Sequence, residues 1–453
     1  MATCFLDLGK KNSPLVALSL AQFVIALDYS VIYVALPEIA RSMQLTGSHV
    51  QWVVSAYGVM FAGFLLMGGR LCDAFGARKI FILAMTLFSL ASLLGGMSTG
   101  ASVLVAARGL QGLGAALLQP AIIALISHYY RLERDRVTAL TVWSAVGAAG
   151  LVAGVVLGGL FIQLSWRLVF LINLPLGWFC LWSARRSFHG VIPLSPSQNI
   201  PLLPSLLATL SVVSMVMAMM SLADHGLNHI ETHRWLGVSA IASLCFLLGE
   251  KYGNRPLVVR ELRRLTSLHR GSIASILYMA SLGSELFLLT MLLQGHYGYS
   301  AMRTAFMFIP LTLMIIAGNG VAGKLFRLIA PLNVLRGGFI VGAAGLWLMT
   351  ISLTGQTGWA SFTAGLLLSG VGHGMVYTAT FVVGMTEVPE ALQGAASGLM
   401  VTAQYTAGAI ALAVLVSILS AYQGISGFYY GFSTLLGLSL LGALLAEEYD
   451  QTV

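Results

Sequence analysis

Three charged residues, Asp28, Arg108 and Glu285, lie deep inside apolar stretches of this 453-residue chain. If those stretches cross a membrane, each charged side chain costs roughly 2.5–3.5 kcal/mol on insertion scales, so it is rarely there by accident. Burial disfavours the charged form of a carboxyl group, so an acid at that depth can carry a proton, or attract a cation when it is ionised. The alternative for Asp28 is a structural acid that holds neighbouring helices together through hydrogen bonds.

The composition indicates that lipid solvates the chain. Hydrophobic residues make up 58% of it and charged residues only 9%, whereas soluble domains carry about 25% charged residues. A helix needs about 20 mostly apolar residues to cross the hydrocarbon core. Fourteen such segments are predicted, at roughly 15–36, 51–72, 79–98, 102–128, 138–163, 167–186, 201–222, 235–250, 271–293, 301–323, 333–353, 358–384, 393–418 and 428–446. No segment alternates as transmembrane strands do, so we expect an all-α polytopic membrane protein.

The basic residues predict the orientation of the chain. With the N-terminus in the cytoplasm, the predicted cytoplasmic loops hold nineteen of the 24 Lys and Arg residues and the opposite loops hold four. This bias follows the positive-inside rule and places both the N- and C-termini in the cytoplasm. The net charge of +8 therefore reflects orientation, and we expect no nucleic acid as a partner.

The loops leave no room for a soluble catalytic or nucleotide-binding domain, because the longest, about 187–200, 223–234 and 251–270, cannot bury a core. The run Gly318–Lys324 begins like a phosphate-binding loop, but Leu325 replaces the required Ser or Thr and no strand precedes it. The scattered histidines, including His373, and the four cysteines show no metal-ligand or disulfide spacing. We therefore expect no enzyme activity, no nucleotide, no metal and no cofactor.

A short internal echo divides the chain into two parallel repeats. The second predicted span ends in Gly69-Arg70-Leu71 and the tenth in Gly323-Lys324-Leu325, each at the end of the second helix of a six-helix group. Parallel repeats are a known transporter plan. The predicted domains are an N-terminal six-helix bundle (15–186), two inserted helices with a cytoplasmic linker (187–270) and a C-terminal six-helix bundle (271–446).

Four signatures in the first half resemble the fourteen-span drug:proton antiporter branch of the major facilitator superfamily. They are Leu27–Pro37 (LDYSVIYVALP), Gly69–Lys79 (GRLCDAFGARK), Leu104–Ala116 (LVAARGLQGLGAA) and Gly147–Gly159 (GAAGLVAGVVLGG). The resemblance covers nearly the whole chain. It implies the major-facilitator fold in a 6+2+6 arrangement, a small-molecule substrate, and a proton gradient as the energy source.

The loop signature implies a conformational latch between the second and third spans. In the family its acid caps a neighbouring helix end and its basic residues tie two helices together. The residues that match this pattern are Gly69, Asp73, Gly76, Arg78 and Lys79. The alternative, a plain positive-inside loop, accounts for the charges but not for the glycine spacing or for Asp73.

The glycines of the fifth predicted span resemble the signature associated with antiporters. Gly150, Gly154 and Gly158, with Gly159 beside them, repeat four apart on one helix face, so a neighbouring helix backbone can approach closely. Val155 stands where the family has proline. The alternative is a tight helix contact without a gating role.

The resemblance also suggests partners for the buried charges. An unpaired guanidinium at the depth of Arg108 would be very costly, and in the superfamily the first and fourth spans line one cavity, so Asp28 is the expected partner. We expect Arg108 to tune Asp28, the alternative being a purely structural pair. Glu285 lies about fourteen residues into the ninth span, as Asp28 does in the first, so the two acids could face each other across the cavity. Its role rests on depth alone.

Aromatic side chains could line that cavity for a bulky apolar ligand. The candidates are Tyr29, Tyr33, Trp143, Phe306, Tyr377, Phe381 and Tyr405. For each one, simple packing or lipid contact is the alternative.

The sequence thus predicts a proton-coupled exporter of lipophilic, cationic drugs or toxic compounds that works by alternating access in the bacterial inner membrane. We expect it to contact membrane lipid, and to act as a monomer or together with periplasmic or outer-membrane partners. The alternatives are a carrier for a specific metabolite or natural product and, more remotely, a membrane receptor or an intramembrane enzyme.

Overall fold

The computed structural model describes residues 13–45, 47–188, 202–226, 228–253, 258, 261–355 and 358–448. Over these residues the secondary structure is helical, without strands, which confirms the all-α prediction. Thirteen helical segments in this part of the chain are long and apolar enough to cross a membrane.

The predicted eighth span, 235–250, lies within α10 (Ile230–Tyr252), which is a helix but is not among the thirteen. Glu231 and Arg234 lie near its start and Glu250 and Lys251 near its end, so its uncharged stretch is short. The count of fourteen spans and the cytoplasmic placement of the termini stay predictions.

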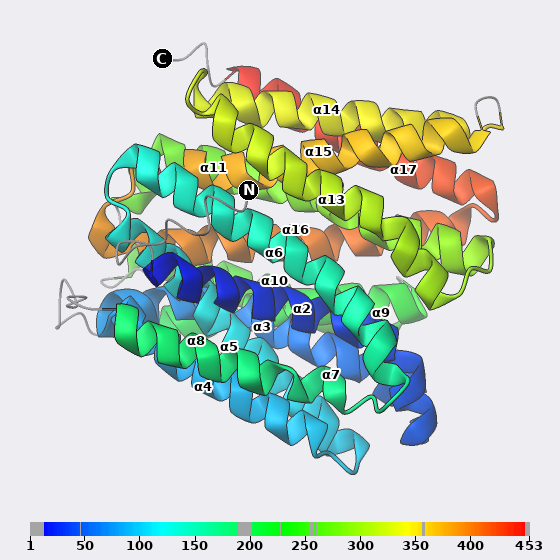
Figure 1. Cartoon of the computed structure of the whole chain (residues 1–453), viewed down its shortest axis with the longest axis horizontal. Helices are drawn as coiled ribbons and strands as arrows, with labels where there is room; N and C mark the ends of the chain where they lie inside the picture. Colours follow the sequence, from blue (N-terminus) through cyan, green and yellow to red (C-terminus); the bar gives the residue numbers. More distant parts are fainter. Residues whose placement is uncertain are drawn as a thin grey trace. The chain divides into compact units, whose positions relative to one another are not determined.

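The chain forms two compact units. Unit 1 comprises Met1–Ile200 and Pro389–Gly398, and unit 2 comprises Pro201–Val388 and Leu399–Val453. The described helices of unit 1 are α2 (Ser13–Ser42), α3 (Gly47–Phe75), α4 (Ala77–Gly96), α5 (Ala101–Tyr129), α6 (Glu133–Ile162), α7 (Leu168–Leu171) and α8 (Asn173–Ser187), with η4 (Glu390–Leu392) and the first turn of α16 (Gln393–Ala421). Helix α2 packs on α6 and α8, while α5 packs on α3 and α4 (Figure 1).

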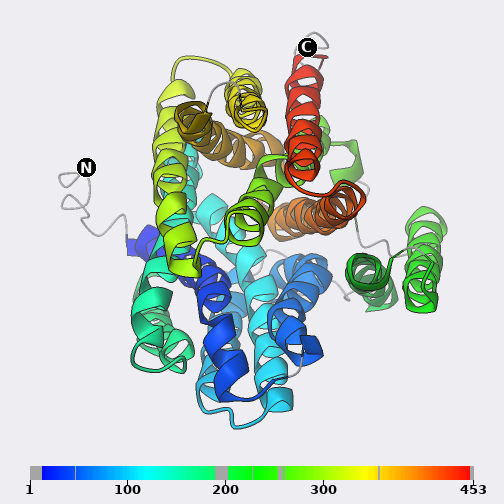
Figure 2. The same ribbon diagram turned by 90° about the vertical axis from the view of Figure 1, so that its right-hand side faces the viewer.

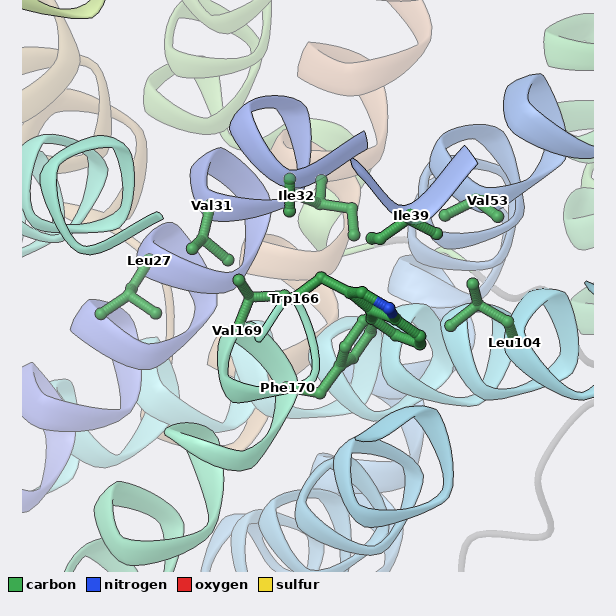
Figure 3. Packing of buried hydrophobic residues seen from close by; sticks show 10 residues of the cluster. Leu27, Val31, Ile32, Ile39, Val53, Leu104, Trp166, Val169 and Phe170 are labelled. Carbon is green, nitrogen blue, oxygen red and sulfur yellow. The ribbon is translucent and has the colours of Figure 1, made fainter. Parts of the chain in front are cut away.

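A hydrophobic cluster fixes the helices of unit 1 around α2. Leu27, Val31 and Ile32 of α2 are almost fully buried and pack with Trp166, beside α7, and other apolar side chains. Figure 3 shows these residues converging from several helices. Fully burying an aliphatic side chain contributes about 1.5–3 kcal/mol, so this cluster holds the middle of α2 in place.

Unit 2 contains the remaining helices. They are α9 (Leu202–His225), α10, η1 (Leu262–Arg264), α11 (Thr266–Ala280), η2 (Leu282–Ser284), α12 (Glu285–Thr290), the π-helix η3 (Met291–His296), α13 (Ala301–Leu325), α14 (Pro331–Ser352), α15 (Gly358–Met385), the rest of α16, and α17 (Ile425–Glu448). Helices α9 and α10 pack on each other (Figure 2), and α15 packs on α11, α13 and α14. The predicted domain boundaries stay predictions.

The ninth span is broken in the middle. The apolar segment Thr266–His296 begins as α11, passes through the 3₁₀ turn η2, and resumes as α12 and η3. Ser281, at the break, has φ −106° and ψ −94°. Its hydroxyl donates to the carbonyl oxygen of Leu277 at 2.5 Å, and the hydroxyl of Ser284 donates to that of Met279 at 2.7 Å. The carbonyl oxygen of Leu277 also accepts from the amide of Ser281 at 3.0 Å, so the hydroxyl of Ser281 adds a second bond there, whereas that of Ser284 supplies a donor to Met279 at the break. A break within a membrane requires such replacement donors.

Candidate functional site

The structure brings Asp28 and Arg108 together as a buried ion pair in unit 1. Nη1 of Arg108, on α5, donates to Oδ2 of Asp28, on α2, at 2.6 Å, and both side chains are 1% exposed. The guanidinium also donates through Nε to the carbonyl oxygen of Val53 at 3.1 Å, and it lies over the Tyr57 ring, 4.5 Å from the centroid. The costly buried cation predicted from the sequence is therefore fully partnered.

Two amide side chains complete the shell around the Asp28 carboxylate. Oδ1 accepts from Nε2 of Gln111 at 2.8 Å and from Nδ2 of Asn173, on α8, at 2.7 Å. Gln111 also accepts from Arg108 at 2.9 Å, and both amides lie within hydrogen-bond distance of the Ser92 hydroxyl. Sequence reasoning assigned no role to Gln111 or Asn173. The available signal was the i, i+3 spacing of Arg108 and Gln111 on one face of an apolar helix.

The predicted glycine face of α6 packs against α2 beside Asp28. A Cβ added to Gly150 would lie 2.7 Å from the carbonyl oxygen of Phe23, and one added to Gly154 would lie 2.5 Å from that of Leu27. A Cβ on Gly158 would lie 3.2 Å from the side chain of Val31. The glycines therefore make a backbone-to-backbone helix contact, whereas a gating role stays a prediction. Gly159 is also buried, and the side chain of Val155 lies outside the described residues.

Asp73 caps the first turn of α16 within unit 1, as the resemblance implies. Its Oδ1 accepts from the amide of Gly394 at 3.1 Å and its Oδ2 from that of Ala395 at 3.0 Å, satisfying two of the amides that a helix start leaves unpaired. A Cβ on Gly69 would collide with the carbonyl oxygen of Gly394, so Gly69 allows the close approach. Nη1 of Arg70 lies 3.9 Å from the Asp73 carboxylate.

The other latch residues are placed differently. Gly76 has φ +92° at the start of α4, a conformation that favours glycine. Arg78 is half-buried and Lys79 is exposed, and neither forms an ion pair in the described part of the chain. A different pair occurs in unit 1: Nδ1 of His128 lies 2.5 Å from Oε1 of Glu390. This contact was not predicted from the sequence.

Glu285 lies in a buried polar environment at the helix break of unit 2. Its side chain is 1% exposed, and Oε2 accepts a short hydrogen bond from the hydroxyl of Ser369 on α15. Its other oxygen, Oε1, has no hydrogen-bond partner among the described residues, and no ion pair involving Glu285 occurs among them. Glu285 and Asp28 belong to different units, so a cavity between them stays a prediction.

His373 and Tyr278 lie close to this acid. The hydroxyl of Tyr278, on α11, and Nε2 of His373, on α15, form a short hydrogen bond, and both side chains are buried. The imidazole also bonds to the backbone of Leu282, in the break. Sequence reasoning considered His373 only as a metal ligand and dismissed it. Its position inside the predicted span 358–384 was the available signal, because intramembrane ionisable residues point to function.

The aromatic candidates divide by exposure. Trp143 and Phe381 are 0% and 1% exposed, whereas Tyr29 and Phe306 are 40% and 59% exposed. Tyr377 and Tyr405 are half-buried, and the side chain of Tyr33 lies outside the described residues. Trp143 and Phe381 are thus closely packed in this conformation, and a substrate-lining role for any of the seven stays a prediction.

Known proteins with similar sequences are named for export or for drug resistance. The chain is 33% identical over 412 residues to the cephamycin export protein CmcT of Amycolatopsis lactamdurans, covering 90% of this chain and 85% of that protein. It is 31% identical to the multidrug resistance protein Stp of Mycobacterium tuberculosis, covering 90% and 76%, and 32% identical to the puromycin resistance protein of Streptomyces alboniger, covering 88% and 80%.

Solved structures and a family model agree on the fold. The human organic anion transporter MFSD10 gives a TM-score of 0.73 at 15% identity, covering 96% of this chain and 99% of that one. The proton:xylose symporter XylE gives 0.70 at 14% identity, covering 97% and 95%. The family model described as Major Facilitator Superfamily matches residues 18–412. The protein is therefore a multi-pass membrane transporter rather than an enzyme, and the chain belongs to the major facilitator superfamily.

Proposed function

We propose that this protein is a proton-coupled antiporter that exports lipophilic, cationic drugs or toxic compounds across a bacterial inner membrane by alternating access. The observation that carries the proposal is the buried Asp28–Arg108 ion pair at 2.6 Å, in a chain whose relatives include a multidrug resistance protein and an antibiotic export protein. The same proposal includes a topology of fourteen spans with both termini in the cytoplasm. It also includes action as a monomer or together with periplasmic or outer-membrane partners.

The geometry suggests how a proton could act at Asp28. The carboxylate accepts three hydrogen bonds, from Arg108, Gln111 and Asn173, and one of these donors is a cation. Binding a proton would remove the attraction and leave the Arg108 guanidinium buried with only neutral acceptors, Gln111 and the carbonyl of Val53. Since a buried cation without a counter-charge is strongly destabilised, protonation would favour a rearrangement of α2 against α5. A cationic substrate could compete for the same carboxylate, which links its binding to proton release.

A second candidate is a dedicated exporter of one natural product. Two relatives carry such names, the cephamycin export protein and the tetracenomycin C resistance and export protein of Streptomyces glaucescens, the latter 28% identical over 417 residues. In that case export would be coupled to protons, as in the first candidate function, but the range of substrates would be narrow.

The test is uptake of ethidium into inverted membrane vesicles energised by respiration. We expect uptake in the wild type to collapse with a protonophore and to disappear in Asp28→Asn. The matched control is Glu38→Gln, the same chemical change at a partly exposed acid of α2 whose partner is Arg41, and it should transport normally.

Well-expressed wild-type protein that takes up no ethidium contradicts the cationic-drug proposal and favours the dedicated exporter. Uptake that survives in Asp28→Asn, or that is indifferent to the protonophore, contradicts coupling at Asp28.

A further inference from the structure

A short helical pattern, a polar residue followed by Gly, an apolar residue and Gly, occurs in both units. Gln111-Gly112-Leu113-Gly114 lies in α5, the fourth helix of the first predicted repeat, and Ser369-Gly370-Val371-Gly372 lies in α15, the fourth helix of the second. The acids lie in the first helix of each predicted repeat, and the separations differ by one residue: 83 from Asp28 to Gln111, and 84 from Glu285 to Ser369.

The contacts of the glycines independently support this alignment of the two predicted repeats, in which Gln111 corresponds to Ser369. A Cβ on Gly112 would collide with the Tyr57 backbone on α3, the second helix of its repeat, and one on Gly114 would lie 3.0 Å from the backbone of Phe88 on α4, the third helix. In unit 2 the order is the same. A Cβ on Gly370 would lie 2.5 Å from the carbonyl oxygen of Leu311 on α13, the second helix, and one on Gly372 would lie 2.5 Å from Cα of Gly342 on α14, the third.

In this register Gln111 and Ser369 occupy corresponding positions and have the same role. The amide of Gln111 donates to the carboxylate of Asp28, and the hydroxyl of Ser369 donates to that of Glu285. Each unit therefore holds one buried acid with a neutral donor from its fourth helix.

The counter-charge is where the units differ. Arg108, three residues before Gln111, corresponds to Leu366, three residues before Ser369, and Leu366 is 2% exposed. An apolar side chain thus occupies the position from which a guanidinium would neutralise Glu285. A buried carboxylate without a counter-charge or a full set of donors is strongly destabilised, and such a group takes a proton instead.

The groups around Glu285 confirm that it lacks a cation in the described part of unit 2. The titratable side chains on the packed helices α11 and α15 are His269, Arg270, Tyr278, His373 and Tyr377. His269 and Arg270 lie in the first two turns of α11, at the end away from the break, and neither forms an ion pair with Glu285 that the described residues show. Tyr405 of α16 lies near Tyr278. Helix α17 packs on α12, where Leu288 meets Gly431, and its described titratable side chains, Tyr429 and Tyr430, are exposed. His296, at the end of η3, is also exposed.

We propose that Glu285 is a second proton-binding site of the transport cycle, separate from Asp28, and that it is protonated in the conformation described. The proposal rests on proton-coupled transport as the function. In the release step the O–H bond of the Glu285 carboxyl breaks, the proton passes to water and the carboxylate remains. The helix break just before Glu285 gives α12 a point at which it can move relative to α11, exposing the carboxyl group to water.

The test measures protonation directly, by infrared spectroscopy of the purified protein in lipid. The wild type should show the C=O stretching band of a buried protonated carboxyl group at neutral pH, and Glu285→Gln should lack it. Leu366→Arg, which supplies the missing cation, should also lose the band, while the matched control Leu366→Met should keep it. Asp28→Asn should keep it too, because the band is assigned to Glu285 alone.

A second measurement connects the band to transport. With a pH-indicator dye in weakly buffered detergent solution, ethidium binding should release one proton fewer per protein in Glu285→Gln than in the wild type. A band of equal intensity in the wild type and Glu285→Gln overturns the proposal, and so does an unchanged proton count in a variant that still binds ethidium. If the band behaves as expected but wild-type uptake ignores a protonophore, coupled export itself is wrong, and Glu285 is not a transport site.

Discussion

Removing the cation from the buried Asp28–Arg108 pair should destabilise the protein far more than removing the cation from a solvent-exposed ion pair. The change Arg108→Met keeps an unbranched side chain in the same place but deletes the charge. The carboxylate of Asp28, 1% exposed, then keeps only the neutral donors of Gln111 and Asn173. An acid that was stabilised as an ion becomes a buried charge without a counter-charge.

The structure sets the size of the effect. Three hydrogen bonds from the guanidinium are lost, to Asp28, Gln111 and the carbonyl of Val53. Breaking a buried ion pair by removing one partner costs about 3–5 kcal/mol, and the two remaining amide donors place the expected loss near the lower end, at about 3 kcal/mol. Because the double variant Asp28→Asn with Arg108→Met removes both charges, it should be more stable than the sum of the single changes by about 2 kcal/mol.

The assay is reversible unfolding of the purified protein in mixed micelles, combined as a double-mutant cycle. Arg41→Met is the matched control, since Arg41 pairs with Glu38 at 2.7 Å, close to the 2.6 Å of the buried pair, but its side chain is 77% exposed. Exposed pairs contribute about 0–1 kcal/mol. The reasoning is refuted if Arg108→Met costs no more than Arg41→Met, or if the double variant equals the sum of the two single variants.

Three further outcomes are expected. Gly154→Val should cost about 1–3 kcal/mol by overpacking α6 against α2; an unchanged melting temperature would contradict that contact. Asp73→Ala should weaken the cap on α16 by about 0.5–2 kcal/mol, seen as faster hydrogen exchange at the amide of Gly394, and equal exchange rates would show that the cap is dispensable. Phe381→Ala should destabilise the fold by about 3–5 kcal/mol, whereas Phe306→Ala, at a side chain that is 59% exposed, should leave stability unchanged; equal losses in thermal unfolding would contradict this division.

The all-helical fold and the pairing of the first acid could be predicted because local costs determine both. Long apolar runs can satisfy their backbone hydrogen bonds in lipid only as helices or closed barrels. A guanidinium in such a run is strongly destabilised without a partner, so the presence of Arg108 predicts a nearby carboxylate. These inferences need only the residue type and its depth in the helix.

The broken ninth span could not be predicted in the same way. Residues 271–293 are apolar apart from a few polar side chains and contain no proline, so the local pattern favours one continuous helix. The break depends on hydroxyl groups that bond back to carbonyl oxygens and on His373, which bonds to the backbone of Leu282 from another helix. The bond from His373 is a tertiary contact between helices, and the hydropathy of one segment does not predict such contacts.

Depth also fails to separate the two acids, because Asp28 and Glu285 lie equally far into their spans. A position about 80 residues further along separates them, which is arginine in one predicted repeat and leucine in the other. A neutral donor from the fourth helix is present in both, through Gln111 and Ser369, so the helix register is shared. The counter-charge differs, and so does the second donor, because Asn173 bonds to Asp28 whereas Oε1 of Glu285 has no partner among the described residues. When an acid that faces a cation binds a proton, its ion pair is lost. When an acid among neutral groups binds a proton, the free-energy cost of burying its charge is removed and no ion pair is lost. The same plan, repeated once, therefore produces one acid that is paired with a guanidinium and one that has no counter-charge among the described residues.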